Sequence, residues 1–276
     1  MGVCTDSRLT YLNGLGYNVI RLPREGIDPL NALGRDPKAG TLENLGSISK
    51  IWKSDTALPV PDPPGDAADV NGQRTDDLKL SIGLEILSGV LSGFGVTTPS
   101  VNVAYERARS VQFEFTNVKV MRVEPLALGE YLANGDLNQS NPFASYFTDS
   151  KKAAFVVTEV LKANAVKVIA KDKSGTTIGV DAPVIQNLVG VKVNVGGSEA
   201  GDHALTYQGQ KLVTFGFKAF GVAFMDGDWR VFGVKPAKEM SFAAGTGLGM
   251  SGGGELAAPA DDTGILLHTG GLLDLA

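Results

Sequence analysis

The clearest periodic stretch of this sequence lies at residues 77–86 and reads Asp77-Leu78-Lys79-Leu80-Ser81-Ile82-Gly83-Leu84-Glu85-Ile86. Apolar and polar side chains alternate along its whole length. A period of two puts successive side chains on opposite faces of an extended chain. We therefore predict an amphipathic β-strand whose apolar face consists of Leu78, Leu80, Ile82, Leu84 and Ile86.

β-Type patterns also dominate the chain on both sides of this stretch. Short apolar alternations that are bounded by Gly, Pro, Asp and Ser predict further strands at residues 16–24, 47–53, 101–105, 111–120, 155–161, 165–171, 176–180, 190–195, 211–225 and 229–235. Two segments with Pro near the start predict short helices at 125–132 and 183–189. Residues 58–77 are rich in Pro, Asp and Gly, and we interpret them as a linker without packed elements.

The composition changes sharply after Ser241. Residues 243–254 are rich in Gly, Ala and Ser, which predicts a flexible tether, and residues 263–276 are apolar again. No Lys or Arg follows Lys238, whereas five acidic residues do, and these account for the whole formal net charge of −5. The tail is an acidic appendage on a neutral body, and its simplest physical description is a flexible tether that carries an apolar plug.

The residue types available for chemistry argue against an enzyme. The single Cys rules out an internal disulfide and a Cys-based zinc site, and the two His leave little for metal ligation or general-base catalysis. The sequence lacks a P-loop and a complete dinucleotide fingerprint. We expect no catalytic residue, metal or cofactor, and the negative net charge argues against a nucleic-acid partner.

Targeting signals are equally sparse. No run of about 18 apolar residues predicts a transmembrane helix, and no basic segment followed by an apolar one predicts a secretory signal. The default expectation is a cytoplasmic protein. Cys4 is a lone thiol near the N-terminus and a candidate S-acylation site, although a buried small hydrophobe is the commoner role of a free Cys.

Two alternating blocks, residues 77–120 and 151–195, each hold enough residues for a hairpin that crosses a bilayer, since one strand needs about 9–11 residues. The second block is locally basic, which favours an approach to anionic headgroups. A half-buried sheet in a soluble protein explains the same alternation. The candidate membrane-inserting residues are Leu78, Leu80, Ile82, Leu84, Ile86, Val101, Val103, Phe155, Val157, Val166 and Val168.

Taken together, the chain resembles the bacterial gasdermins, relatives of the animal pore-forming gasdermins. The most specific part of the likeness is Cys4 followed by Leu15-Gly16-Tyr17-Asn18-Val19-Ile20-Arg21-Leu22-Pro23-Arg24, with Gly26-Ile27 and Pro29-Leu30 behind it. The overall length and the short apolar tail also match. The resemblance implies an α+β fold with a twisted, mostly antiparallel central β-sheet, peripheral helices and a short C-terminal inhibitory tail.

The resemblance also implies a cytoplasmic executioner of anti-phage defence that is monomeric until it is cut. In that family a caspase-like protease removes the tail, and the released body oligomerises in the inner membrane as a very large ring. Two hairpins per subunit join into a transmembrane β-barrel, and the cell dies. An N-terminal Cys is palmitoylated in the family, and Cys4 is the matching position.

On this interpretation, residues 1–242 form the pore-forming domain, residues 243–262 a protease-accessible linker and residues 263–276 an autoinhibitory peptide. The apolar side chains expected to cover the body are Ile265, Leu266, Leu267, Leu272, Leu273 and Leu275. The candidate cleavage positions are Leu248, Met250, Leu256, Asp261 and Asp262. The rival interpretation is a soluble, non-enzymatic β-sheet module that binds a ligand or lipid and forms no pore.

Overall fold

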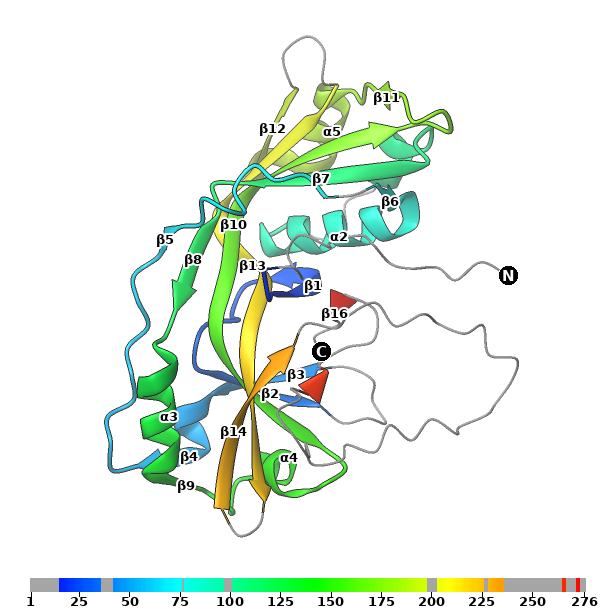
Figure 1. Cartoon of the computed structure of the whole chain (residues 1–276). Coiled ribbons are helices and arrows are strands. Elements are labelled where there is room, and N and C mark those ends of the chain that lie inside the picture. The colour runs from blue at the N-terminus through cyan, green and yellow to red at the C-terminus, as the bar shows by residue number, and fades with distance from the viewer. Residues whose placement is uncertain are drawn as a thin grey trace, which may run out of the picture.

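The computed structural model describes residues 15–35, 42–75, 77–96, 101–197, 203–225, 228–235, 265–266 and 272–273. These residues form an α+β fold around a curved, mostly antiparallel sheet (Figure 1). The main path through this sheet is β15-β14-β13-β10-β2-β3, and further strands pair along both sides of β10 and β13. A separate ladder joins β4 (Trp52–Ser54) to β9 (Gly135–Leu137).

Two long strands, β10 (Ala153–Lys171) and β13 (Leu205–Met225), pair antiparallel and form the centre of the sheet. At about 3.3 Å per residue, the 19 residues of β10 extend over roughly 60 Å. Most side chains of β10 are buried, including neighbours that point to opposite faces of the sheet. This double burial explains why the sequence of β10 reads as a nearly continuous apolar run with little strict alternation.

Shorter strands flank the central pair on both sides. Along the outer side of β10 lie β2 (Asn31–Arg35), β8 (Lys119–Arg122) and β7 (Ser110–Thr116). Outside these lie β3 (Leu42–Ser47) on β2, β5 (Gly65–Asp66) on β8 and β6 (Leu78–Lys79) on β7. Strand β11 (Thr177–Ile178) pairs with the end of β10 on the opposite side, beyond the start of β13. Along the other side of β13 lie β12 (Val193–Gly197), β1 (Asn18–Arg24) and β14 (Asp228–Lys235).

An irregular line crosses the sheet near its middle, and we call it the crease. The register between β10 and β13 shifts between Ala163 and Ala165. Next to it β7 gives way to β8 at Asn117, whose φ of 55° is uncommon for a residue other than Gly. The Asn117 side chain donates a hydrogen bond of 2.7 Å to Asn164 Oδ1. The crease separates an upper half with β7, β11 and β12 from a lower half with β2, β8 and β14 (Figure 1).

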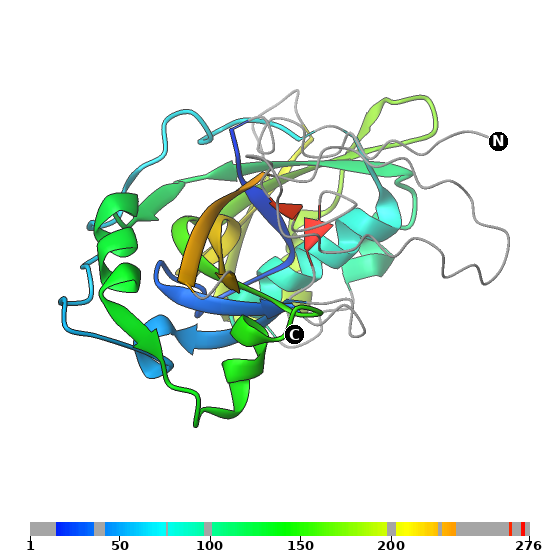
Figure 2. The same ribbon diagram turned by 60° about the horizontal axis from the view of Figure 1, so that its bottom comes forward.

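Four helices surround the sheet in the described part of the chain: α2 (Leu80–Gly93), α3 (Pro125–Ala133), α4 (Ser145–Thr148) and α5 (Ala182–Val189). Helix α2 packs against β1, β7 and β13, whereas α3 lies at the lower end of the molecule (Figure 1, Figure 2). Helices α3 and α5 each have Pro in the first turn, where its missing N–H is not needed. Both helices confirm the sequence predictions at 125–132 and 183–189.

The strand predicted at residues 77–86 is wrong beyond β6, because the chain enters helix α2 at Leu80. Leu80, Ile82, Leu84 and Ile86 therefore lie on a helix. The buried positions of the helix follow a helical period: they are Gly83, Ile86, Leu87, Gly89, Val90 and Leu91. The strict alternation ends at Ile86, and only a window that reaches residue 91 reveals the 3.6-residue period.

Other predictions divide between confirmation and correction. The strands predicted at 111–120, 155–171, 211–225 and 229–235 are confirmed, with 155–161 and 165–171 joined into one strand. The strand predicted at Val101 and Val103 is wrong, because both lie in a 3-10 helix at Val101–Tyr105. Ile48–Lys50 and Gly190–Lys192 are also 3-10 turns within predicted strands. The region interpreted as a linker contains β5, so this interpretation is wrong for part of residues 58–77.

The sheet divides the buried apolar residues into three clusters. The largest lies in the upper half beneath α2 and α5, and its aromatic centre includes the rings of Phe115 and Phe215, which stack 4.1 Å apart. A second cluster surrounds Trp52 and α3 at the lower end. A third contains Phe155 and Phe217. The upper half of the sheet thus has a core of its own, on which α2 sits.

Candidate functional site: the covered sheet edge and helix α2

The C-terminal tail adds two short strands to the outer edge of the sheet. Strand β15 (Ile265–Leu266) pairs parallel with Val234 and Lys235 of β14. Strand β16 (Leu272–Leu273) pairs parallel with Val19 and Ile20 of β1. Both appear as red arrows beside these strands in Figure 1. An open strand edge is a ready template for another chain, and the tail occupies this template at two places.

The structure describes only part of the predicted tail site. The backbones of Ile265, Leu266, Leu272 and Leu273 lie in the two added strands. Leu267 and Leu275 lie outside the described residues. The same holds for Cys4 and for every candidate cleavage position, namely Leu248, Met250, Leu256, Asp261 and Asp262.

The start of β1, which receives β16, is anchored by Tyr17, directly before the strand, and by one side chain each from β10 and β13. The Tyr17 hydroxyl donates a hydrogen bond to a Glu159 carboxylate oxygen. The Lys218 ammonium lies 4.3 Å from the centre of the Tyr17 ring and 3.4 Å from Glu159. Burial, and then the Glu159 carboxylate, raise the pKa of Tyr17 above its usual value. These contacts fix β1 on β13, so the tail docks on a held edge.

Helix α2 approaches the sheet closely where its residues lack side chains. A Cβ atom on Gly83 would lie 2.0 Å from Cγ2 of Val111 on β7, and one on Gly93 would lie 2.3 Å from Cγ1 of Val213 on β13. Both distances are far below van der Waals contact. The two glycines therefore let α2 sit directly on the upper core.

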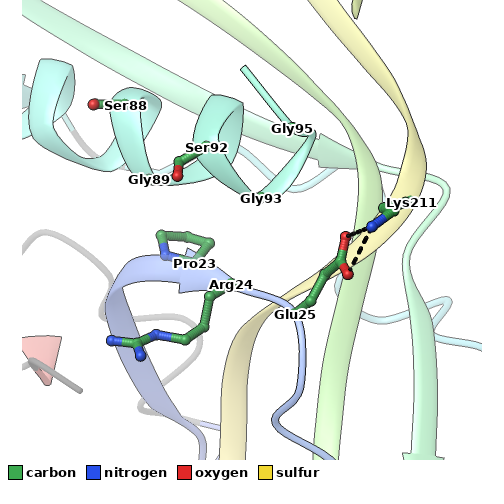
Figure 3. A pocket seen from close by; sticks show the side chains of 9 residues that line it. All are labelled: Pro23, Arg24, Glu25, Ser88, Gly89, Ser92, Gly93, Gly95 and Lys211. Atoms are coloured by element: carbon green, nitrogen blue, oxygen red, sulfur yellow. Dashed lines mark hydrogen bonds and ion pairs between the residues drawn. The ribbon is translucent and has the colours of Figure 1, made fainter. Parts of the chain in front are cut away.

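A pocket of about 510 Å³ opens between the C-terminal half of α2, the end of β1 and β13. Small residues of α2 line one wall, including Ser88 and Ser92, and Lys211 and Glu25 form an ion pair of 3.0 Å on the opposite wall (Figure 3). The Arg24 side chain points away from this pair, and its partial burial lowers the pKa of the guanidinium group. Helix α2 is thus tightly packed at Gly83 and Gly93, and it also contacts β1 beside the pocket.

The predicted membrane-inserting residues face the protein interior in this structure. Phe155, Val157, Val166 and Val168 on β10 are at most 2% exposed, with the first two in the third cluster and the last two beneath α2. Leu78, Ile86 and Val101 are buried as well. Leu80, Ile82 and Leu84 are partly buried against the upper cluster, whereas Val103 has 69% of its surface exposed. The buried side chains can meet lipid only if the sheet rearranges on both sides of the crease.

The described residues hold neither a metal-ligand cluster nor a membrane-spanning helix. No group of three or more His, Cys, Asp or Glu side chains among them could hold a metal ion. No helix in the same part of the chain is both long and apolar enough to cross a bilayer.

Sequence comparison identifies the relatives of this chain. A family model described as the Bacterial Gasdermin Family matches residues 20–230. A protein named gasdermin bGSDM from Vitiosangium sp. (strain GDMCC 1.1324) is 40% identical over 280 residues, which cover 100% of this chain and 99% of the relative. A second gasdermin bGSDM, from a Desulfuromonadales bacterium, is 32% identical over 99% of this chain and 98% of its own.

Structural comparison agrees at the level of the fold. The solved structure of a bacterial gasdermin from Bradyrhizobium tropiciagri superposes with a TM-score of 0.64. The aligned region covers 96% of this chain and 94% of that one, at 16% sequence identity. The arrangement of a curved sheet with peripheral helices is therefore shared with a solved protein.

Proposed function

The chain belongs to the bacterial gasdermin family, and on this basis we propose that it is an autoinhibited pore-forming protein whose body is released when a protease removes the C-terminal tail. Members of this family are non-enzymatic pore-forming proteins with a general role in cell death and defence. The chain is accordingly not an enzyme. Its activity depends instead on how the tail keeps the body inactive and on how the body is released.

The observation that carries the proposal is the pairing of β15 and β16 with β14 and β1. Each ladder joins only two residue pairs, and a hydrogen bond contributes about 0.5–1.5 kcal/mol net. The ladders alone therefore hold the tail weakly. While the tether is intact, the tail stays at an effective concentration on the order of millimolar, and cutting the tether removes this advantage. The cut peptide then dissociates, and the edge becomes available.

The exposed edge and the upper half of the sheet then act together. Strands that join those of neighbouring copies into a closed β-barrel have all their backbone groups satisfied inside lipid. Residues 77–120 and 151–195 supply the two hairpins, which requires α2 to leave the sheet and extend. A large ring in the inner membrane is the product.

The remaining parts of the proposal concern partners and boundaries. Residues 1–242 form the pore-forming domain, residues 243–262 the linker that a caspase-like protease cuts, and residues 263–276 the inhibitory peptide. The protein is cytoplasmic and monomeric until cleavage, and it serves anti-phage defence by killing its own cell. A palmitoyl group on Cys4 assists membrane insertion, since a single acyl chain anchors only marginally by itself.

A controlled cleavage experiment tests the proposal. A recognition sequence for a site-specific protease is inserted between Gly254 and Glu255, and the purified protein is added to anionic vesicles that hold a fluorescent dye. We expect dye release only after the protease is added, and none from a matched protein with a scrambled recognition sequence. A cut protein that binds vesicles without leakage would refute the pore and support the lipid-binding alternative.

A further inference from the structure

Helix α5 carries apolar side chains on two opposite faces. Its inner side chains, Ile185 and Val189, are buried in the upper core. On the outer side, Val184 and Leu188 lie one helical turn apart and are 48% and 39% exposed. Val191 follows in the next 3-10 turn with 94% of its surface exposed. We call these three outer side chains the α5 stripe. The outer face of a surface helix is usually polar, so the stripe departs from the common pattern.

The stripe is displayed on a firmly held element. The Asp181 side chain caps the helix by accepting a hydrogen bond of 3.3 Å from the Val184 N–H. At the other end the Gln186 side chain bonds to three backbone groups within residues 190–195, and one of these is a hydrogen bond of 2.8 Å from the Val195 N–H. None of these contacts uses a side chain of the stripe, so the stripe can be changed without loosening the helix.

The stripe lies at the end of the molecule where both candidate hairpins turn. Helix α5 belongs to the connection between β10 and β12, at the upper end in Figure 1. It packs against η2 (Val101–Tyr105), which belongs to the connection between α2 and β7. Val101 and Tyr105 are buried in the upper core, whereas Val103 between them is exposed. The connections within residues 77–120 and 151–195 thus both expose apolar side chains.

A lipid surface fits the stripe better than a protein partner does. A stable protein interface takes about 20–30 residues from each side, whereas the stripe and Val103 together offer four apolar side chains. A bilayer sets no such minimum, because apolar side chains enter the boundary between headgroups and acyl chains individually. The charges agree with this choice. Residues 101–109 and 172–192 hold four basic and three acidic side chains, a balance of +1 (4 − 3) in a chain of net charge −5, and anionic headgroups attract basic side chains.

We propose that the α5 stripe is a lipid-docking surface, whose side chains enter the headgroup region of an anionic bilayer before the hairpins extend. This inference rests on the proposed function, in which residues 77–120 and 151–195 cross the membrane. The connection of a hairpin must enter the bilayer ahead of its strands, and apolar side chains do so at a lower free-energy cost than polar ones. So few side chains bind weakly in one copy, but their contributions add when many copies assemble on one bilayer.

A polarity-sensitive fluorescent label on the stripe tests the docking step. Val191→Cys is combined with Cys4→Ser and with the recognition sequence for a site-specific protease, so that one thiol only takes the label. The cut protein is then mixed with dye-filled anionic vesicles. We expect a blue shift of the label that precedes dye release. A matched label on Leu126→Cys of α3, which is 80% exposed at the lower end, should not shift before release.

The possible outcomes separate the docking surface from the pore. A Val191 label that shifts only together with dye release, or not at all, would overturn the docking surface. A shift that needs no vesicles and grows with protein concentration would assign the stripe to a second copy of the chain, and it would overturn the inference as well. If the label shifts but the cut parent protein releases no dye, the docking surface stands and the proposed pore is refuted.

Matched double variants give an independent readout. Leu188→Gln/Val191→Gln removes one Leu and one Val from the stripe, and Val60→Gln/Leu126→Gln removes the same residue types from exposed positions outside it. We expect the partitioning of the cut protein onto anionic vesicles to fall about 10-fold in the stripe variant, since burial of a single Val or Leu side chain is worth roughly that factor or more. The control variant should partition like the parent, and urea unfolding of both uncut variants checks the fold. Equal partitioning of the two variants, with a parent that leaks after cutting, would refute the docking surface and leave the proposed function intact.

Discussion

Replacement of Gly83 by Ala tests how helix α2 is held on the sheet. The added methyl group would lie 2.0 Å from Cγ2 of Val111, which is buried and 1% exposed. Overpacking of this kind costs about 1–3 kcal/mol, whereas Ala favours a helix over Gly by about 1 kcal/mol. We expect a net destabilisation of about 0–2 kcal/mol, so the single variant alone decides little.

The decisive quantity is the coupling between Gly83 and Val111. Val111→Ala by itself removes two buried methyl groups, worth ~0.8 kcal/mol each, and leaves a cavity. In the double variant Gly83→Ala/Val111→Ala the clash disappears while the gain in helix propensity remains. The double variant should therefore be more stable than the sum of the two single effects by about 1–3 kcal/mol.

Urea unfolding of the uncut protein measures all three variants. Gly129→Ala on α3 is the matched control, because nothing lies within 4 Å of a Cβ at that position, and it should stabilise the protein by up to about 1 kcal/mol. If the effects of Gly83→Ala and Val111→Ala on the free energy of unfolding add within about 0.5 kcal/mol, α2 does not rest on Val111 as described. If α2 leaves the sheet during activation, Gly83→Ala should also speed leakage of the cut protein.

Three further predictions concern the buried tyrosine pair, the crease and the tail. Tyr105 and Tyr207 share a buried hydrogen bond of 2.7 Å between their hydroxyl groups, so either single change to Phe strands a hydroxyl and should cost about 1–3 kcal/mol in urea unfolding, whereas the double change should cost less. Burial raises the pKa of both tyrosines in the folded protein, whereas in the unfolded chain they ionise near pH ~10. Ionisation above that pH therefore favours the unfolded chain, and the free energy of unfolding should fall as the pH rises further. The fall should be smaller in the double Phe variant. Asn117→Gly should be tolerated and Asn117→Val should cost about 1–3 kcal/mol in the same unfolding assay, because the backbone there has a positive φ. Leu266→Asp with Leu273→Asp should make the uncut protein leak vesicles or aggregate, and an unchanged, harmless double variant would count against autoinhibition by the tail.

The long strands and the short Pro-started helices were predictable because each carries its own local signal. The apolar run of β10 and the turn before Trp229 indicate strands without any knowledge of their neighbours. Helix α2 escapes prediction because its first half alternates like a strand and because its Ser and Gly residues are weak helix formers. It is packing of Ile86, Leu87, Val90 and Leu91 on the upper core that makes it a helix.

The site was harder to predict because it depends on which edges the topology leaves open. The apolar tail predicts a cover for the body. In the structure β16 pairs with β1, which lies over 200 residues earlier in the chain, and β15 pairs with β14, which lies about 30 residues earlier. Residues 62–75 resemble a linker in sequence because Pro, Asp and Gly predict turns. Their hydrogen bonds go to β7 and β8, roughly 40–60 residues away, and no local pattern encodes such partners.

The pairing of β16 with β1 also has a consequence for the order of events during synthesis. Strand β1 is the first described strand to be synthesised, and β16, which covers its edge at Leu272 and Leu273, is the last. Between Lys235, where β14 ends, and Leu273 the ribosome must add 38 residues (273 − 235), which takes about 2–8 s at 5–20 residues per second. The edge strands of every new molecule are thus synthesised before the segments that cover them.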